Sequence, residues 1–206
     1  MNQQALALGQ DRVVRGVPRD PKSFGDPSHG QVLDHDPDTI ENARDFGSEV
    51  FYGDAARLDL LRAAGAAQAR VLVVAVDDVD RSLAIVDLAR EHFPQLTVVA
   101  RARNVQHHFA LRDRGVQLIE RETLDSALLS ARSVLEQLGW LPHQARQLSM
   151  RFRRHLVEQL ERMYPHHRDE QALVSVAKQG RQQLEELFAQ EREALGRQRQ
   201  AAPWNQ

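Results

Sequence analysis

The chain contains no cysteine among its 206 residues. Disulfide bonds, thiolate metal sites and cysteine nucleophiles are therefore excluded. An excess of charge of one sign is also missing, because 27 Lys and Arg residues are balanced by 29 Asp and Glu residues. A dedicated nucleic-acid-binding domain normally carries a clear positive excess, so this balance argues against nucleic acid as a partner.

Long hydrophobic runs are absent as well. The longest uninterrupted one, Val71–Val76, is far shorter than the roughly 20 residues of a helix that crosses a bilayer. The N-terminus also has no apolar stretch of the kind found in secretion signals. We therefore expect a cytoplasmic chain, or one that reaches the cytoplasmic face of the inner membrane through a partner.

Catalytic motifs are missing too. The sequence contains neither the G-x-S-x-G turn of serine hydrolases nor the G-x-x-x-x-G-K-[ST] loop of nucleotide hydrolases. The pairs His107-His108 and His166-His167 are adjacent rather than spaced to share one helix face. We therefore expect solvated surface histidines rather than a metal site. No catalytic residue is predicted, and the chain is expected not to be an enzyme.

Proline and glycine interrupt the first 30 residues at short intervals. No strand or helix periodicity survives there, which predicts a disordered leader over residues 1–30. From residue 31 onward, apolar segments of strand length alternate with segments of helical periodicity. Strands are predicted over 31–33, 49–52, 71–76, 97–102 and 116–119. Helices are predicted over 36–46, 58–64, 78–92, 104–114 and 122–138.

This alternation predicts βαβ units, and hence an α/β domain with a Rossmann-like parallel sheet and flanking helices over residues 31–121. Residues 122–206 are predicted to be a helical region. The first helix of that region has apolar residues at helical spacing along its length, and we expect it to take part in dimerisation.

Ligands of such sheets bind beyond the carboxyl ends of the strands. Polar residues follow four of the predicted strands, and these are the candidate site residues: Asp34 and His35, then Gly53, Asp54 and Ala55, then Asp77, and finally Arg101 and Arg103. A carboxylate at the end of a strand, such as Asp34, accepts hydrogen bonds from ribose hydroxyls in dinucleotide-binding folds.

Each of these residues also has a structural interpretation. Asp36 and Asp78 are better explained as helix caps, whereas for Asp34 a ligand role is favoured. For Asp54 the structural alternative is support of a turn. Arg101 and Arg103 lie two apart in a strand and so point to one face. They suit a carboxylate or phosphate, but ion pairs with Glu120 or Glu122 explain them equally well.

The Gly-rich turn that holds the pyrophosphate of a dinucleotide is missing, because no G-x-G-x-x-G occurs in the chain. The acidic strand end is therefore present without its phosphate-binding turn. An NAD(P)-dependent oxidoreductase would need that turn together with a catalytic acid or base. Such an oxidoreductase fragment is retained only as an alternative.

A series of motifs in one order resembles the cytosolic domain of Kef-type glutathione-regulated potassium-efflux proteins. The motifs lie at 33–38, 50–55, 59–66, 91–94, 100–103, 120–123 and 152–154. The resemblance covers roughly residues 32–163 and implies a regulatory domain of the RCK or KTN type, also called TrkA-N-like. The chain is then expected to be an N-terminally truncated form, without the membrane domain, the first strand and the Gly-rich turn.

The resemblance also implies ligands and partners. Asp34 matches the ribose-binding acid, Asp54 and Ala55 the turn beside the adenine of NAD(H) or AMP, and Asp77 the strand end lining the same pocket. Arg101 and Arg103 match a site for an anion such as glutathione. The implied partners are a second copy of the chain and a potassium-efflux membrane domain or full-length transporter, and no metal is implied. A stand-alone interaction module that associates with a transporter is the other alternative.

Overall fold

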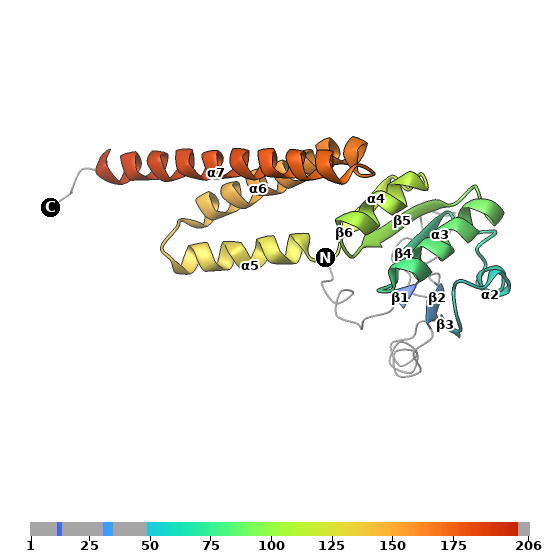
Figure 1. Ribbon diagram of the computed structural model, residues 1–206. Coiled ribbons are helices and arrows are strands. Elements are labelled where there is room, and N and C mark those ends of the chain that lie inside the picture. Colours follow the sequence, from blue (N-terminus) through green and yellow to red (C-terminus); the bar gives the residue numbers. More distant parts are fainter. Residues whose placement is uncertain (1–11, 14–30, 35–48, 202–206) are drawn as a thin grey trace. The chain divides into compact units, whose positions relative to one another are not determined.

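The computed structural model describes residues 12–13, 31–34 and 49–201 (Figure 1). The chain divides into two compact units, with the boundary between Thr123 and Leu124. The first unit contains the sheet, and the second contains only helices. The helix predicted over residues 36–46 lies outside the described residues.

A six-stranded sheet forms the first unit, in the order β3-β2-β1-β4-β5-β6. Five of its strands are β2 (Gln31–Asp34), β3 (Glu49–Tyr52), β4 (Val71–Ala75), β5 (Thr97–Ala102) and β6 (Leu118–Arg121). β2 pairs in parallel with β3, and β4, β5 and β6 pair in parallel with one another. The predicted α/β class with a largely parallel sheet is therefore confirmed.

The sixth strand, β1 (Arg12–Val13), lies within the segment that the sequence predicts to be a disordered leader. It runs antiparallel between β2 and β4, with Val13 paired to Leu33 on one side and to Val74 on the other. The prediction that no strand precedes residue 31 is thus wrong at these two residues. Backbone N–H and C=O groups of β2 and β4 need partners, and even a two-residue extended segment supplies some of them. The rest of the predicted leader lies outside the described residues.

Three helices accompany the sheet: α2 (Leu58–Ala63), α3 (Val79–His92) and α4 (Val105–Asp113) (Figure 1). The Asp78 side chain caps α3 by accepting a hydrogen bond from the Arg81 amide at 2.7 Å, which confirms the predicted cap. On β4, Leu72 and Val74 are buried while the alternate residues are half-buried. They pack with α3 residues such as Ile85 and Val86, both fully buried, to form the core of this unit.

The strand β6 and the following helix begin two residues later than predicted. The amide of Glu122 still donates to the carbonyl of Ala102 in β5, at 3.1 Å. The backbone at Glu122 is therefore still paired with the sheet. The next helix, α5 (Leu124–Gln137), starts beyond it.

The second unit consists of α5, α6 (Pro142–Met163), a short 3-10 helix (Tyr164–His166) and α7 (Glu170–Ala201). α6 packs against both α5 and α7. Between α6 and α7, the Gln159 side chain donates to the Val176 carbonyl at 2.7 Å. A Cβ at Gly180 would lie about 2.1 Å from the Gln159 side chain, so the absence of a side chain at Gly180 permits this close packing.

None of the helices in the described part of the chain is both long enough and apolar enough to cross a membrane.

The packing of α3 on the sheet gives a first prediction. Ile85 is fully buried in the core, and truncation of such a side chain leaves a cavity. We expect Ile85→Ala to lower the free energy of unfolding by roughly 2–5 kcal/mol. Chemical denaturation of the purified chain measures this loss. Leu129→Ala is the control, because Leu129 is 59% exposed; an equal loss in both variants would contradict the assigned core.

Candidate functional site

The turn that follows β3 is fixed by its own residues. Gly53 has a φ of +155°, and a Cβ there would lie 2.2 Å from the Leu60 side chain, so a glycine is required. The Asp54 Oδ1 accepts a hydrogen bond from the Ala56 amide at 2.9 Å, while Ala55 is buried. Asp54 therefore supports the turn, the structural role that the sequence offered for it.

The same aspartate also reaches a neighbouring element. Its Oδ2 lies 3.2 Å from a guanidinium nitrogen of Arg81 near the start of α3. Because Asp78 caps the Arg81 amide, Arg81 is held by its backbone and by its side chain. The turn after β3 and the N-terminus of α3 are thus linked at the carboxyl edge of the sheet.

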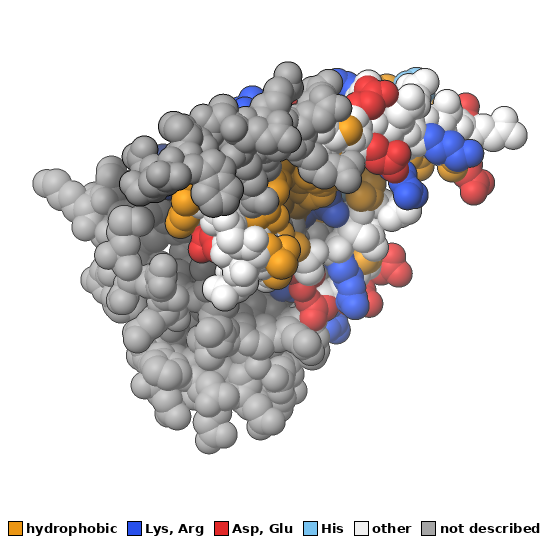
Figure 2. Space-filling model, turned by 90° about the vertical axis from the view of Figure 1, so that its left-hand side faces the viewer, with side chains coloured by type: hydrophobic (Ala, Val, Ile, Leu, Met, Phe, Trp, Pro, Cys, Tyr) orange, Lys and Arg blue, Asp and Glu red, His pale blue; other side chains and the backbone are white. Residues whose placement is uncertain are grey.

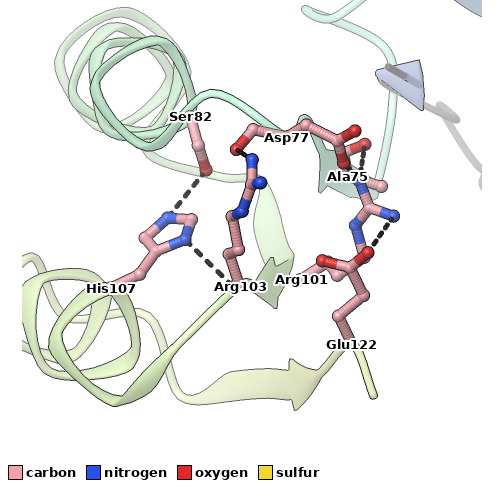
Figure 3. A network of polar contacts seen from close by, with 7 residues as sticks. All are labelled: Ala75, Asp77, Ser82, Arg101, Arg103, His107 and Glu122. Carbon is pink, nitrogen blue, oxygen red and sulfur yellow. Dashed lines mark hydrogen bonds and ion pairs between the residues drawn. The ribbon is translucent and has the colours of Figure 1, made fainter. Parts of the chain in front are cut away.

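A second cluster lies where β4 and β5 end (Figure 3). Arg101 of β5 donates from Nη2 to the Ala75 carbonyl at 2.9 Å, and the same nitrogen forms a close ion pair with the Asp77 carboxylate. The Arg103 side chain donates to the Asp77 carbonyl at 3.2 Å. Asp77 therefore receives hydrogen bonds from both arginines, one through its side chain and one through its backbone.

A second carboxylate approaches Arg101 from the other side. Glu122 Oε1 lies 3.6 Å from Nη1 of Arg101, so the ion pair considered from the sequence is present in the structure. Arg101, Asp77 and Glu122 have side chains that are 27%, 24% and 34% exposed. With Arg103 the cluster has two positive and two negative groups, and its charges nearly cancel. Chemically, it holds one guanidinium group, that of Arg101, which already binds two carboxylates and remains open to solvent in part, and a second, that of Arg103, which donates to a backbone carbonyl.

The structure brings together only some of the predicted site residues. Asp77, Arg101 and Arg103 form one cluster, while Asp54 belongs to the turn joined to α3. Asp34 closes β2 opposite Tyr52 of β3, and His35 lies outside the described residues.

His107 and His108 are buried, at 1% and 9% exposure, so the expectation of solvated surface histidines is wrong for this pair. Burial lowers the pKa of His107, and the positive charges of Arg101 and Arg114 lower it further. The sequence did contain a signal for this position. Asn104 caps α4 by accepting a hydrogen bond from the His107 amide at 2.8 Å, and a cap of this kind fixes which residues of the first turn face inward.

Within the part of the chain that the structure describes, no group of three acidic or histidine side chains is placed to hold a metal ion.

Two family models match the chain. One, described as the TrkA-N domain, matches residues 22–121, and it begins inside the segment predicted to be a leader. The other, described as the potassium efflux system KefB C-terminal domain, matches residues 126–202. Together they include most of the chain, and their matched segments lie on either side of the boundary between its two units.

Individual relatives give the same result. The glutathione-regulated potassium-efflux system protein KefC of Escherichia coli O157:H7 is 46% identical over 164 residues, which are 80% of this chain and 26% of the relative. The protein of the same name from Shigella boydii serotype 18 has the same identity and coverage. This chain thus spans about a quarter of the length of these curated relatives.

Among solved structures, the Kef CTD of Shewanella denitrificans in AMP-bound form is similar to this chain. The TM-score is 0.60 and the sequence identity is 41%, over 66% of this chain and 82% of that one.

Proposed function

The chain belongs to the family of Kef-type potassium-efflux regulatory domains, and on that premise we propose that it is a non-catalytic ligand sensor of such a system. In this proposal it binds a glutathione-like anion at Arg101 and Arg103 and an adenine nucleotide at the same edge of the sheet. It acts in the cytoplasm on the membrane part of a potassium-efflux transporter. The observation that carries the proposal is the cluster of Asp77, Arg101 and Arg103 where β4 and β5 end.

The contacts of Arg101 support an exchange of carboxylates. Asp77 forms a close ion pair with it, whereas the 3.6 Å contact to Glu122 exceeds hydrogen-bond length. A carboxylate of glutathione therefore replaces Glu122 more readily than Asp77. Only Thr123 separates Glu122 from α5. Ligand binding would thus release a side chain at the segment that joins the two units, which gives the sensor a route to the helical unit.

The proposed exchange predicts opposite effects of two substitutions. Glu122→Gln removes the competing charge and is expected to raise the affinity for glutathione about twofold to fivefold. Arg103→Ala removes a charged donor and is expected to lower it by about tenfold or more. Isothermal titration calorimetry on the full chain measures both.

Glu91→Gln is the matched control, because the Glu91 side chain is 74% exposed on α3 and the change in net charge is the same as in Glu122→Gln. If Glu122→Gln and the unmodified chain bind glutathione with equal affinity, the proposed exchange is wrong. If Arg103→Ala and the unmodified chain do so, the proposed site is wrong.

We expect the chain to bind an adenine nucleotide only weakly. Asp54 has both carboxylate oxygens engaged, by the Ala56 amide and by Arg81. Asp34 is the predicted acceptor for the ribose hydroxyls, but the sequence contains no G-x-G-x-x-G turn to hold phosphates. The residues present therefore fit an adenosine better than they fit a pyrophosphate. When bound, the nucleotide would supply recognition and no chemical step.

We expect AMP and NADH to bind weakly or undetectably to the chain alone. Each missing hydrogen bond to a charged phosphate contributes about 1.5–3 kcal/mol, so the loss of two or three weakens binding by roughly a thousandfold. A strand, a G-x-G-x-x-G turn and a helix grafted ahead of Gln31 should restore binding, and Asp34→Ala should abolish the restored binding. Micromolar NADH binding by the unmodified chain, measured by calorimetry, would contradict this prediction.

Self-association is proposed through α5. The helix packs on α6 with Leu128 buried and Leu124 and Leu135 half-buried. A neighbouring stripe is exposed, and it consists of Ala127, Ala131 and Val134 on the same helix, with Leu138 directly after the end of the helix. The apolar face of α5 is therefore wider than the part that the described residues cover. Figure 2 shows apolar side chains (orange) beside charged ones (red and blue) among the described residues in one view of the chain.

Exposed stripes of this kind promote association, and a second copy of the chain offers an identical stripe. We expect dimers or larger species in sedimentation at micromolar concentration. Val134→Asp, at a position 58% exposed, should shift the chain towards monomer. Ser133→Asp places the same charge on another side of α5 and should leave the dimer intact. A monomer in the unmodified chain would exclude this interface.

A further inference from the structure

A buried histidine lies beside Arg103 and connects α4 with the end of β5 and with α3 (Figure 3). His107, in the first turn of α4, is 1% exposed. Its Nδ1 accepts a hydrogen bond from the Arg103 amide at 3.2 Å. Its Nε2 lies 3.1 Å from the Ser82 hydroxyl oxygen, and Ser82, in α3, is fully buried.

These contacts determine where the ring carries its proton. A backbone N–H can only donate, so Nδ1 of His107 is the acceptor and is unprotonated. The proton is therefore on Nε2, which donates to the Ser82 hydroxyl. The charged ring would place a second N–H against the Arg103 amide. Burial and the guanidinium groups of Arg101 and Arg114, which lower the pKa of His107, favour the neutral form for the same reason.

The hydrogen bonds of His107 close a ring of contacts with the arginine cluster. Arg103 is held at its amide by His107 and at its side chain by the Asp77 carbonyl. Asp77 directly precedes the N-cap of α3, and Ser82 lies in the first turns of that helix. The end of β5 is thus fastened to the start of α3 at two points, through Asp77 and through His107 with Ser82.

We propose that His107 is a positioning residue for the anion site. Its neutral imidazole holds the backbone at Arg103 so that the guanidinium groups of Arg101 and Arg103 both lie at Asp77. His107 itself is too deeply buried to touch a ligand. The inference rests on the proposed function of the cluster and adds the part that orients it. A histidine that only stabilised the core would change stability without changing the affinity of the folded chain.

Two substitutions separate the two hydrogen bonds of the ring. Asn at position 107 places an amide oxygen near Nδ1 and keeps an acceptor for Arg103. Gln at that position places its amide near Nε2 and keeps only a partner for Ser82. With glutathione as the probe, calorimetry on the full chain should give the order of affinity wild type, then His107→Asn, then His107→Gln. Each lost hydrogen bond is expected to cost about threefold to tenfold.

Ser82 provides a second pair of variants in case a substitution of His107 prevents folding. Ser82→Ala removes the acceptor and should weaken glutathione binding about threefold or more, whereas Ser82→Thr keeps the hydroxyl and should restore it. His108→Gln is the control for loss of a buried imidazole, because His108 contacts Phe109 edge-on on the same helix. Equal affinities across the Ser82 and His107 variants would overturn the proposal.

A measurement without ligand distinguishes failure of this inference from failure of the proposed function. Nitrogen-15 NMR of the free chain should show a neutral His107 ring with its proton on Nε2, and a narrow, shifted Nη–H signal for Arg103, because Nη1 of that residue donates to the Asp77 carbonyl. That Arg103 signal should collapse to its random-coil position in His107→Gln and persist in His107→Asn. If glutathione fails to bind but these signals are found, the proposed function falls and the positioning role stands. A charged ring, or an Arg103 signal that His107→Gln leaves unchanged, overturns the positioning role.

Discussion

The Arg101 guanidinium is the contact on which the rest of the site depends. From β5 it reaches the Ala75 carbonyl and the Asp77 carboxylate at the end of β4. Parallel strands end at one edge of the sheet, so a long side chain on one of them can bind the loop after its neighbour. Without this contact, the loop that leads into α3 would be joined to the end of β5 only through Arg103 and through His107 with Ser82. The Asp77 carboxylate would then have no arginine partner among the contacts of this cluster.

The contacts of the cluster suit the proposed exchange of carboxylates. Its positive and negative groups nearly cancel, so this cluster is not an isolated positive site that would attract every anion. One carboxylate, Asp77, is bound closely, while the other, Glu122, lies at 3.6 Å from Arg101 and is the one that we propose a ligand replaces. Partly exposed ion pairs of this kind contribute little to stability, which leaves their arrangement free to respond to a ligand. This property suits a sensor better than a catalyst.

The sequence predicted the sheet because its strands and helices are separated by clear caps and turns. Val71–Val76 and the Asp78 cap are local signals, and both were found within a residue of the prediction. The spacing of Arg101 and Arg103 predicts that they share one face, and in the structure both contact Asp77; their role as ligands stays a prediction.

Contacts between distant residues were harder to predict. The antiparallel strand at Arg12–Val13 follows from the pairing needs of β2 and β4, which no short segment of sequence reveals. The burial of His107 depends on Ser82, which is 25 residues away in the chain. A pair of adjacent histidines is by itself more typical of a solvated surface, and so the interpretation from composition was wrong.

In the proposed sensor, an anionic ligand binds where β4 and β5 end and displaces Glu122 from Arg101. Chemical-shift mapping during a titration of the full chain with glutathione follows both events. We expect the largest changes at the amides of Arg101, Arg103 and Glu122, with changes at Asp77 beside them. Changes confined to α6 and α7, or no changes at saturating glutathione, would contradict it.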